Sequence, residues 1–377
     1  MKILSIFGTR PEAIKMAPVV HALERDGRFE SRVCVTAQHR HMLDQVLSLF
    51  NIRPHWDLNL MQPDQDLSDL TARILVNVRK VLRDERPDVV LVHGDTTTCF
   101  ASALAAFHER VRIGHVEAGL RTRDLRSPFP EEANRTLVAR LAEYNFAPTC
   151  QARENLRAEG IREDRIEVTG NTVVDALLSI RRRVKEASPE QWRSHFGDAL
   201  IERLADPVRR LVLITSHRRE NFGHGLVELC TAIRDLAQTH REWEFVYPVH
   251  PNPNVQKPVA EILRGEPNVQ LIAPQNYEPF VWLMDKSDVI LTDSGGIQEE
   301  ALSLGKPVLV MRETTERPEA LLSSAVRLVG TSHDSIVGGV TELVSAEATR
   351  PRVDVLPNPF GDGAAAGRIV EHLAKSC

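Results

Sequence analysis

Short apolar runs of strand length alternate with helical segments along almost the whole chain. The expected strands span residues 2–8, 32–37, 88–92, 112–116, 144–148 and 166–170 in the first half, and 211–215, 245–249, 269–273, 289–291 and 307–311 in the second. Strands that alternate with helices in this way favour parallel sheets covered by helices on both faces. We therefore expect an α/β fold with two doubly wound domains that face each other across a cleft.

The length of the chain sets the expected number of domains. With 377 residues, of which 42% are hydrophobic and 26% charged, the chain exceeds the size of a usual single core. Residues 173–207 have a helical pattern and many charges, which suits a linker helix and the outer surface of a second domain. We place the boundary after residue 170, so that the domains cover 1–170 and 171–359.

Charge and hydropathy disfavour several classes of protein. A formal net charge of -5 and a pI near 6.3 argue against nucleic-acid binding, which needs a clustered basic surface. The three arginines at 181–183 are interpreted as a solvated helix face. The apolar runs are too short to span a membrane, and Met1 and Lys2 lead into a strand rather than a signal-peptide core. We predict a cytoplasmic protein.

The sequence gives no sign of a metal or cofactor site. The five cysteines are widely spaced without a C-x-x-C, so neither a disulfide framework nor a zinc site is expected. His39 and His41 have no later carboxylate or cysteine at ligand spacing. The motifs G-x-G-x-x-G, G-x-x-x-x-G-K-[ST] and G-x-S-x-G are absent, which disfavours a Rossmann-type NAD site and a P-loop ATPase. We expect no cofactor.

The segment 289–301 has the pattern of a phosphate-binding turn. An apolar strand is followed by Ser294, Gly295 and Gly296, whose backbone can approach a ligand closely. The next helix has free N–H groups and the positive end of its dipole at this turn, and both favour an anion. Glu300 is expected in the first turn of that helix. There it either complements the dipole or holds two hydroxyl groups of a ribose.

Three carboxylates occupy comparable positions in the first half of the chain. Asp95 and Glu117 follow strands, and Glu131 begins a helix. Because the carboxyl ends of parallel strands meet at one edge of a sheet, we expect the three side chains at the same edge. Each carboxylate considered alone can be explained as a helix cap or a surface charge. The three together favour acid-base catalysis. Arg10 follows the first strand, where its guanidinium is either solvated or able to clamp a phosphate.

Several motifs in a fixed order carry a resemblance that spans both halves of the chain. They are Gly8-Thr9-Arg10-Pro11-Glu12, Gly94-Asp95-Thr96, His115-Val116-Glu117-Ala118-Gly119-Leu120-Arg121, Pro130-Glu131-Glu132-Ala133-Asn134-Arg135, His217-Arg218-Arg219-Glu220-Asn221 and Asp293-Ser294-Gly295-Gly296-Ile297-Gln298-Glu299-Glu300. In these motifs the chain resembles the bacterial non-hydrolysing UDP-N-acetylglucosamine 2-epimerases. The resemblance implies a GT-B type fold of two Rossmann-like domains, with a last helix at about 360–377 that packs back on the first domain.

The resemblance also implies a reaction. UDP is eliminated across carbons 1 and 2 of UDP-N-acetylglucosamine to leave 2-acetamidoglucal, and its re-addition on the other face gives UDP-N-acetylmannosamine. This reversible epimerisation would supply cell-surface polysaccharide synthesis. A homodimer is common in the family and is expected here.

The same resemblance assigns roles to residues. Asp95, Glu117 and Glu131 would be the acid-base groups, without a distinction between acid and base, and His217 would assist near the pyrophosphate. Phosphates, ribose, uracil and further polar groups would be held by Arg10, Lys15, Gln275, Phe280, Ser294, Gly295, Gly296, Glu300 and Arg317.

Two alternatives and one regulatory question stay open at this point. A GT-B glycosyltransferase would share the Gly-Gly turn and Glu300, and a non-catalytic UDP-sugar sensor would share the cleft, but neither accounts for three carboxylates on the first sheet. Some family members bind a second UDP-sugar as an activator, and this would involve Gln38 and His39. Asp64 stands where a cationic partner is expected, which argues against activation here.

Overall fold

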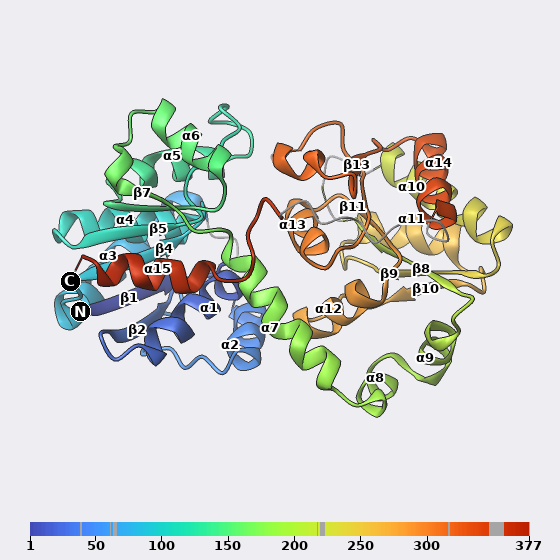
Figure 1. Cartoon of the computed structure of the whole chain (residues 1–377), viewed down its shortest axis with the longest axis horizontal. Helices are drawn as coiled ribbons and strands as arrows, with labels where there is room; N and C mark the ends of the chain where they lie inside the picture. Colours follow the sequence, from blue (N-terminus) through green and yellow to red (C-terminus); the bar gives the residue numbers. More distant parts are fainter. Residues whose placement is uncertain are drawn as a thin grey trace. The chain divides into compact units, whose positions relative to one another are not determined.

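Every pair of neighbouring strands in the structure is parallel, and helices connect nearly all of them (Figure 1). The computed structural model describes residues 1–37, 40–60, 62, 66–216, 218, 223–315, 317–346 and 358–376. The chain forms two units, one made of Met1–Ala176 with Pro359–Cys377 and the other of Leu177–Asn358. The sequence-based boundary after residue 170 precedes α7 (Thr172–Glu186), whereas the units divide within this helix.

The first unit is built on a seven-stranded sheet with the order β3-β2-β1-β4-β5-β6-β7. Its strands are β1 (Lys2–Phe7), β2 (Glu30–Val35), β3 (Trp56–Asp57), β4 (Val89–His93), β5 (Arg112–Val116), β6 (Tyr144–Ala147) and β7 (Ile166–Val168). The order reverses direction between β1 and β4, and such a switch point is where open parallel sheets bind ligands. All of β4 is buried, because helices cover both faces of a parallel sheet.

The helices of this unit follow the predicted alternation. They are α1 (Arg10–Arg25), α2 (Arg40–Leu49), α3 (Leu67–Glu85), α4 (Thr97–His108), α5 (Glu131–Leu141), α6 (Cys150–Ala158), the 3-10 turn η1 (Glu163–Arg165), the start of α7, and α15 (Ala365–Ala374). Strand β3 is not among the strands expected from the sequence. Two residues at a sheet edge are too few for a periodic pattern, and their pairing with β2 became visible only in the fold.

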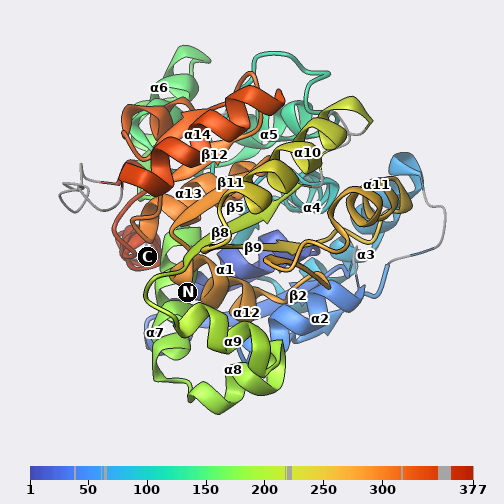
Figure 2. The same cartoon turned by 90° about the vertical axis from the view of Figure 1, so that its right-hand side faces the viewer.

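The chain returns to the first unit at its C-terminal end. Helix α15 packs against α1, and both chain ends lie near each other in Figures 1 and 2. The carboxylate of Asp175 accepts hydrogen bonds from the first N–H groups of α15, at 3.2 Å from Ala365 and 2.9 Å from Ala366. These bonds satisfy donors that a helix start leaves open, so they fix where α15 begins.

The second unit is built on a six-stranded sheet with the order β10-β9-β8-β11-β12-β13. Its strands are β8 (Arg210–Thr215), β9 (Trp243–Pro248), β10 (Val269–Ile272), β11 (Val289–Thr292), β12 (Val308–Val310) and β13 (Val326–Leu328). Strand β13 was not predicted, because three residues at an edge leave a weak pattern. The order again reverses, here between β8 and β11.

The helices of the second unit cover its sheet on both faces. They are the rest of α7, α8 (Pro189–Phe196), α9 (Asp198–Ala205), α10 (His224–Thr239), α11 (Pro253–Leu263), α12 (Tyr277–Lys286), α13 (Gly295–Ser303), the 3-10 turn η3 (Pro318–Leu322) and α14 (His333–Ala346). In Figure 2, α10 lies between α14 and α11, and the three helices share one apolar core with strands of the sheet. The prediction of two doubly wound parallel sheets is confirmed.

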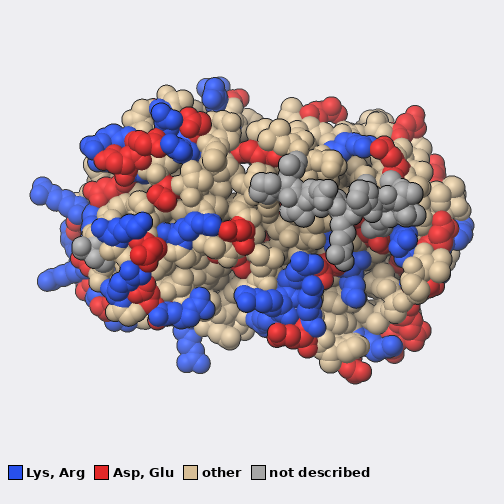
Figure 3. Space-filling view, viewed as in Figure 1, with Lys and Arg blue, Asp and Glu red and all other residues tan. Residues whose placement is uncertain are grey.

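Basic and acidic side chains are mixed on the face drawn in Figure 3. The arginine run on α7 is partly paired, with Arg181 at 2.7 Å from Asp285 and Arg183 at 3.4 Å from Glu278. These pairs to α12 agree with the interpretation of the run as a helix face rather than a nucleic-acid stripe.

Candidate active site

Two of the predicted carboxylates follow neighbouring strands of the first sheet. Asp95 comes two residues after β4, and Glu117 directly follows β5, while Glu131 is the first residue of α5. Burial raises the pKa of Asp95, the Arg135 charge opposes this rise, and the negative charges of Glu117 and Glu131 add to it. Because charges influence each other's pKa only at short range, the three carboxylates form one electrostatic group. The structure thus brings these three predicted residues together.

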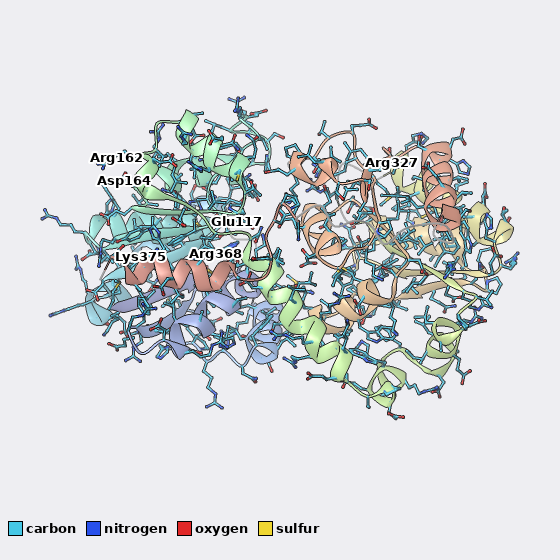
Figure 4. All side chains as sticks on the ribbon, viewed as in Figure 1. Glu117, Arg162, Asp164, Arg327, Arg368 and Lys375 are labelled. Carbon is cyan, nitrogen blue, oxygen red and sulfur yellow. The ribbon has the colours of Figure 1, made fainter. Side chains whose placement is uncertain are left out.

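Glu117 is held in an unusual backbone conformation and by several polar neighbours. Its φ is 66°, which side-chain-bearing residues rarely adopt, and its side chain is only 8% exposed. Its Oε2 pairs with Nζ of Lys15 and accepts a 2.8 Å hydrogen bond from Nδ2 of Asn171. Figure 4 marks the position of Glu117 after β5. Lys15, predicted to contact substrate, therefore lies against the candidate acid-base group in this structure.

Two buried histidines lie beside these carboxylates. Burial lowers the pKa of His93 to about 3 and that of His115 to about 4. Nε2 of His115 is 2.7 Å from the Gly94 carbonyl oxygen, and Nε2 of His93 is 3.9 Å from Oε2 of Glu117. Both rings are therefore neutral near pH 7, so they add no positive charge beside Glu117.

Helix α5 fastens Asp95 at two points. The guanidinium of Arg135 lies 2.8 Å from Oδ2 of Asp95, and Nδ2 of Asn134 donates to the Asp95 carbonyl oxygen at 2.8 Å. Glu132 is 1% exposed, lies 3.6 Å from Arg135, and accepts bonds from the backbone N–H groups of residues 122 and 123. The helix that begins with Glu131 therefore also positions Asp95 and the preceding loop.

At the turn after β1, the carboxylate of Glu12 binds the backbone N–H groups of the turn. Glu12 is buried and accepts hydrogen bonds from the N–H groups of Gly8 at 2.9 Å and Thr9 at 2.8 Å. Thr9 and Glu12 form a capping box at the start of α1, and Oγ1 of Thr96 donates to Glu12 at 2.6 Å. Arg10 is the first residue of α1 at this turn, and a guanidinium is a group that can bind an anion.

In the second unit, the start of α13 has the character of a ligand-binding turn. Ser294 precedes the helix without a side-chain cap, and the helix begins at Gly295. A Cβ added at Gly296 would meet no atom within 4 Å, and its φ is not positive. The protein's own packing therefore does not require glycine at 296, which leaves space for an atom of a ligand close to the helix N-terminus.

Glu300 lies deeper in α13 than the sequence suggested. The helix has no acidic residue in its first turn, so the prediction that Glu300 stands there is wrong. The prediction placed the helix start too late, because the two glycines were assigned to the turn and not to the helix. Since the dipole acts mainly within the first turn, the dipole interpretation of Glu300 loses its basis. Glu300 is 8% exposed, and the hydroxyl of Tyr277 donates to it at 3.1 Å.

Two of the remaining predicted residues of this unit, Arg317 and Gln275, have protein partners. Arg317 pairs with the buried Glu299. Oε1 of Gln275 is 2.7 Å from Nε2 of His195, and its Nε2 donates to the Ala273 carbonyl oxygen at 2.6 Å. Phe280 lies half-buried in α12.

The buried Asp293 accepts hydrogen bonds from two described residues that follow β8. Its Oδ2 accepts hydrogen bonds from Oγ of Ser216 at 3.1 Å and from the N–H of Arg218 at 2.9 Å. His217 itself lies outside the described residues, and so do Gln38, His39 and Asp64.

The sequence and the fold match one enzyme family along their full length. The UDP-N-acetylglucosamine 2-epimerase family matches residues 21–374. A UDP-N-acetylglucosamine 2-epimerase of Escherichia coli K12 is 57% identical over 373 residues, which cover 99% of this chain and 98% of that protein. The chain belongs to the UDP-N-acetylglucosamine 2-epimerase family. The resemblance predicted from the motifs is confirmed.

Solved structures of this family share the fold. A Neisseria meningitidis UDP-GlcNAc 2-epimerase bound to UDP-GlcNAc is 49% identical, covers 100% of both chains and has a TM-score of 0.91. A Methanocaldococcus jannaschii UDP-GlcNAc 2-epimerase in complex with UDP-GlcNAc and UDP is 33% identical over 100% of both chains, with a TM-score of 0.79. These likenesses establish the predicted GT-B type architecture.

Among the residues that the structure describes, no group of three or more His, Cys, Asp or Glu side chains is arranged to hold a metal ion. In the same part of the chain, no helix has both the length and the apolar character needed to cross a bilayer.

Family motifs alone did not indicate three residues that the structure adds to the site. Arg135 lies in the motif at residues 130–135, in which a function was predicted only for Glu131. His93 ends a strand and reads as a buried core residue. Asn171 lies 54 residues after Glu117, and its local sequence indicates only that it precedes the helix α7.

Proposed function

We propose that this chain interconverts UDP-N-acetylglucosamine and UDP-N-acetylmannosamine by inversion at carbon 2. In the proposed reaction UDP is eliminated to leave 2-acetamidoglucal and then re-added on the opposite face. The observation that carries the proposal is the electrostatic group of Asp95, Glu117 and Glu131 at the carboxyl edge of the first sheet. The reaction needs one group to remove the proton on carbon 2 and another to return a proton from the other side, which three carboxylates can supply.

The surroundings of the carboxylates support different protonation states. Burial and the negative charges of Glu117 and Glu131 raise the pKa of Asp95, while the Arg135 guanidinium opposes that rise. Glu117 lies against the Lys15 ammonium and the Asn171 amide, and both favour its charged form. Two carboxylates whose surroundings shift their pKa values in opposite directions are suited to work as an acid and a base.

Nucleotide binding is assigned to the second unit. The open start of α13 would receive the phosphates through the backbone N–H groups at 295 and 296. Glu300 would accept hydrogen bonds from the ribose hydroxyls, and Phe280 and Gln275 would lie beside uracil. Arg10 of the first unit and Arg317 would supply further contacts to the departing UDP. A supply of cell-surface polysaccharide precursors, a cytoplasmic location and a homodimer stay predictions.

The reaction is tested by incubating the protein with UDP-N-acetylglucosamine alone in heavy water. We expect a second UDP-sugar that carries deuterium at carbon 2, without added NAD or sugar acceptor, because the abstracted proton exchanges with solvent. Mass spectrometry and NMR of the UDP-sugars measure both outcomes. A glycosyltransferase would need an acceptor, and a sensor would give no product. Product that retained the original hydrogen completely would instead indicate oxidation and reduction through a carbonyl.

Nucleotide binding is tested at Glu300. Replacing Glu300 with Ala should weaken UDP binding by roughly 1.5–3 kcal/mol, the usual cost of losing hydrogen bonds to a charged group. Calorimetry gives the dissociation constants. Glu261→Ala removes an exposed carboxylate from α11 of the same unit and should leave the affinity unchanged. Equal UDP affinity of the Glu300 and Glu261 variants would exclude Glu300 from the ribose site.

A further inference from the structure

Asn171 stands at the place where the chain leaves and re-enters the first unit. It directly precedes α7, which carries the chain into the second unit, and the chain returns at Pro359. The N–H of Asn171 donates to the carbonyl oxygen of Phe360 at 2.7 Å. This backbone hydrogen bond joins the outgoing and the returning segment.

Two glycines let these segments approach each other closely. Gly170 has a φ of +91°, and a Cβ there would lie 3.4 Å from the Cα of Gly361 and from the Phe360 oxygen. Gly361 has a φ of +112°, and its added Cβ would lie 3.2 Å from the Cα of Gly170. Both conformations favour glycine, and larger residues would push the segments apart. This packing sets the position of the Asn171 backbone.

In the side chain of Asn171, one amide orientation gives hydrogen-bond partners to both the oxygen and the nitrogen. Its Oδ1 accepts a 3.0 Å hydrogen bond from the N–H of Val173, and its Nδ2 donates to Oε2 of Glu117 at 2.8 Å. The backbone N–H can only donate and a carboxylate without a proton can only accept, so a flipped amide would lose both bonds. Asn171 is 2% exposed, so water does not replace these partners.

We infer that Asn171 is a positioning residue for Glu117, and that it fixes this carboxylate from the junction of the outgoing and returning segments. The amide gives Glu117 a directed, neutral donor beside the Lys15 ammonium. Because the donor is anchored at its backbone and at Oδ1, it restricts where Oε2 can lie. This inference rests on the proposed function, because positioning matters only if Glu117 exchanges a proton with the substrate.

The test uses Asn171→Ser in the full-length chain. Serine keeps a good helix cap but is too short to reach Glu117, so the variant should fold and bind UDP like the wild type. We expect kcat to fall by about tenfold to a hundredfold with little change in KM, since a hydrogen bond to a charged group is lost. The limb of the pH profile that reports Glu117 should move to higher pH, because loss of a donor disfavours the charged carboxylate.

A matched control is Asn252→Ser. Asn252 caps α11 through the same pattern, with Oδ1 accepting the N–H two residues later at 2.9 Å, and it lies in the second unit. This variant should keep both kcat and the pH profile of the wild type. Asn171→Asp is the second variant, since it keeps size and cap but places a like charge against Glu117, and its kcat should fall further than that of Asn171→Ser.

The outcomes separate this inference from the proposed function. If the wild type gives no second UDP-sugar, the proposed function fails. If the wild type turns over and Asn171→Ser keeps its kcat and pH profile, the positioning role of Asn171 is wrong. The same conclusion holds if Asn171→Asp is as active as the wild type. A fall in kcat with equal thermal stability and a shifted limb supports the inference.

Discussion

Glu117→Gln, Asp95→Asn and Glu131→Gln are each expected to lower turnover by about 10²–10⁴-fold, the usual contribution of a positioned acid or base. These variants keep the shape of the side chain but cannot exchange a proton. UDP affinity should change far less, because nucleotide binding is assigned to the second unit. Turnover is measured as the appearance of the second UDP-sugar, and UDP affinity by calorimetry.

The matched control for this set is Glu154→Gln, which makes the same chemical change on the exposed side of α6. It should have wild-type turnover. The three carboxylates would be structural, and the catalytic assignment would fail, if all three site variants also kept near-normal turnover. A variant that lost UDP affinity and turnover in parallel would point to a binding role for that residue.

Arg135→Ala is expected to give the largest loss of stability. It leaves the buried Glu132 without its nearby cation and removes the charged partner 2.8 Å from Asp95. Breaking a buried ion pair by removing one partner costs about 3 kcal/mol at the lower end of its range. The lower end applies because the side chain of Asp95 is 27% exposed and therefore partly screened by water. Turnover should fall as well, because Asp95 loses its fixed orientation.

Thermal and urea unfolding measure this loss against Arg140→Ala. Arg140 is exposed on the same helix, so its removal should change the free energy of unfolding by no more than about 0.5 kcal/mol. An Arg135 variant as stable as the Arg140 variant would show that Glu132 and Asp95 do not depend on the guanidinium. Asp95 would then be held mainly through its backbone by Asn134.

The order of elements was predictable because it depends on local patterns. Apolar runs such as 89–92 and the turns that follow them identify buried parallel strands, and each strand end marks a candidate site residue. The edge strands β3 and β13 were missed, since two or three residues form a strand only through pairing with a neighbour. The start of α13 was misplaced for a similar reason, because glycine has a low intrinsic helix propensity and its inclusion depends on the surrounding fold.

The sequence by itself determined the family and the two parallel sheets. It also predicted Asp95 and Glu117 at one sheet edge, because the strand ends of a parallel sheet share that edge. Only the tertiary structure decided what surrounds those carboxylates. Asn171 reaches Glu117 across 54 residues of sequence, and Lys15 reaches it across 102. No periodicity or motif spacing encodes such contacts, since they arise when separate strand ends and the returning chain meet. Protonation and orientation depend on these neighbours, so the chemistry of each carboxylate is a property of the folded protein.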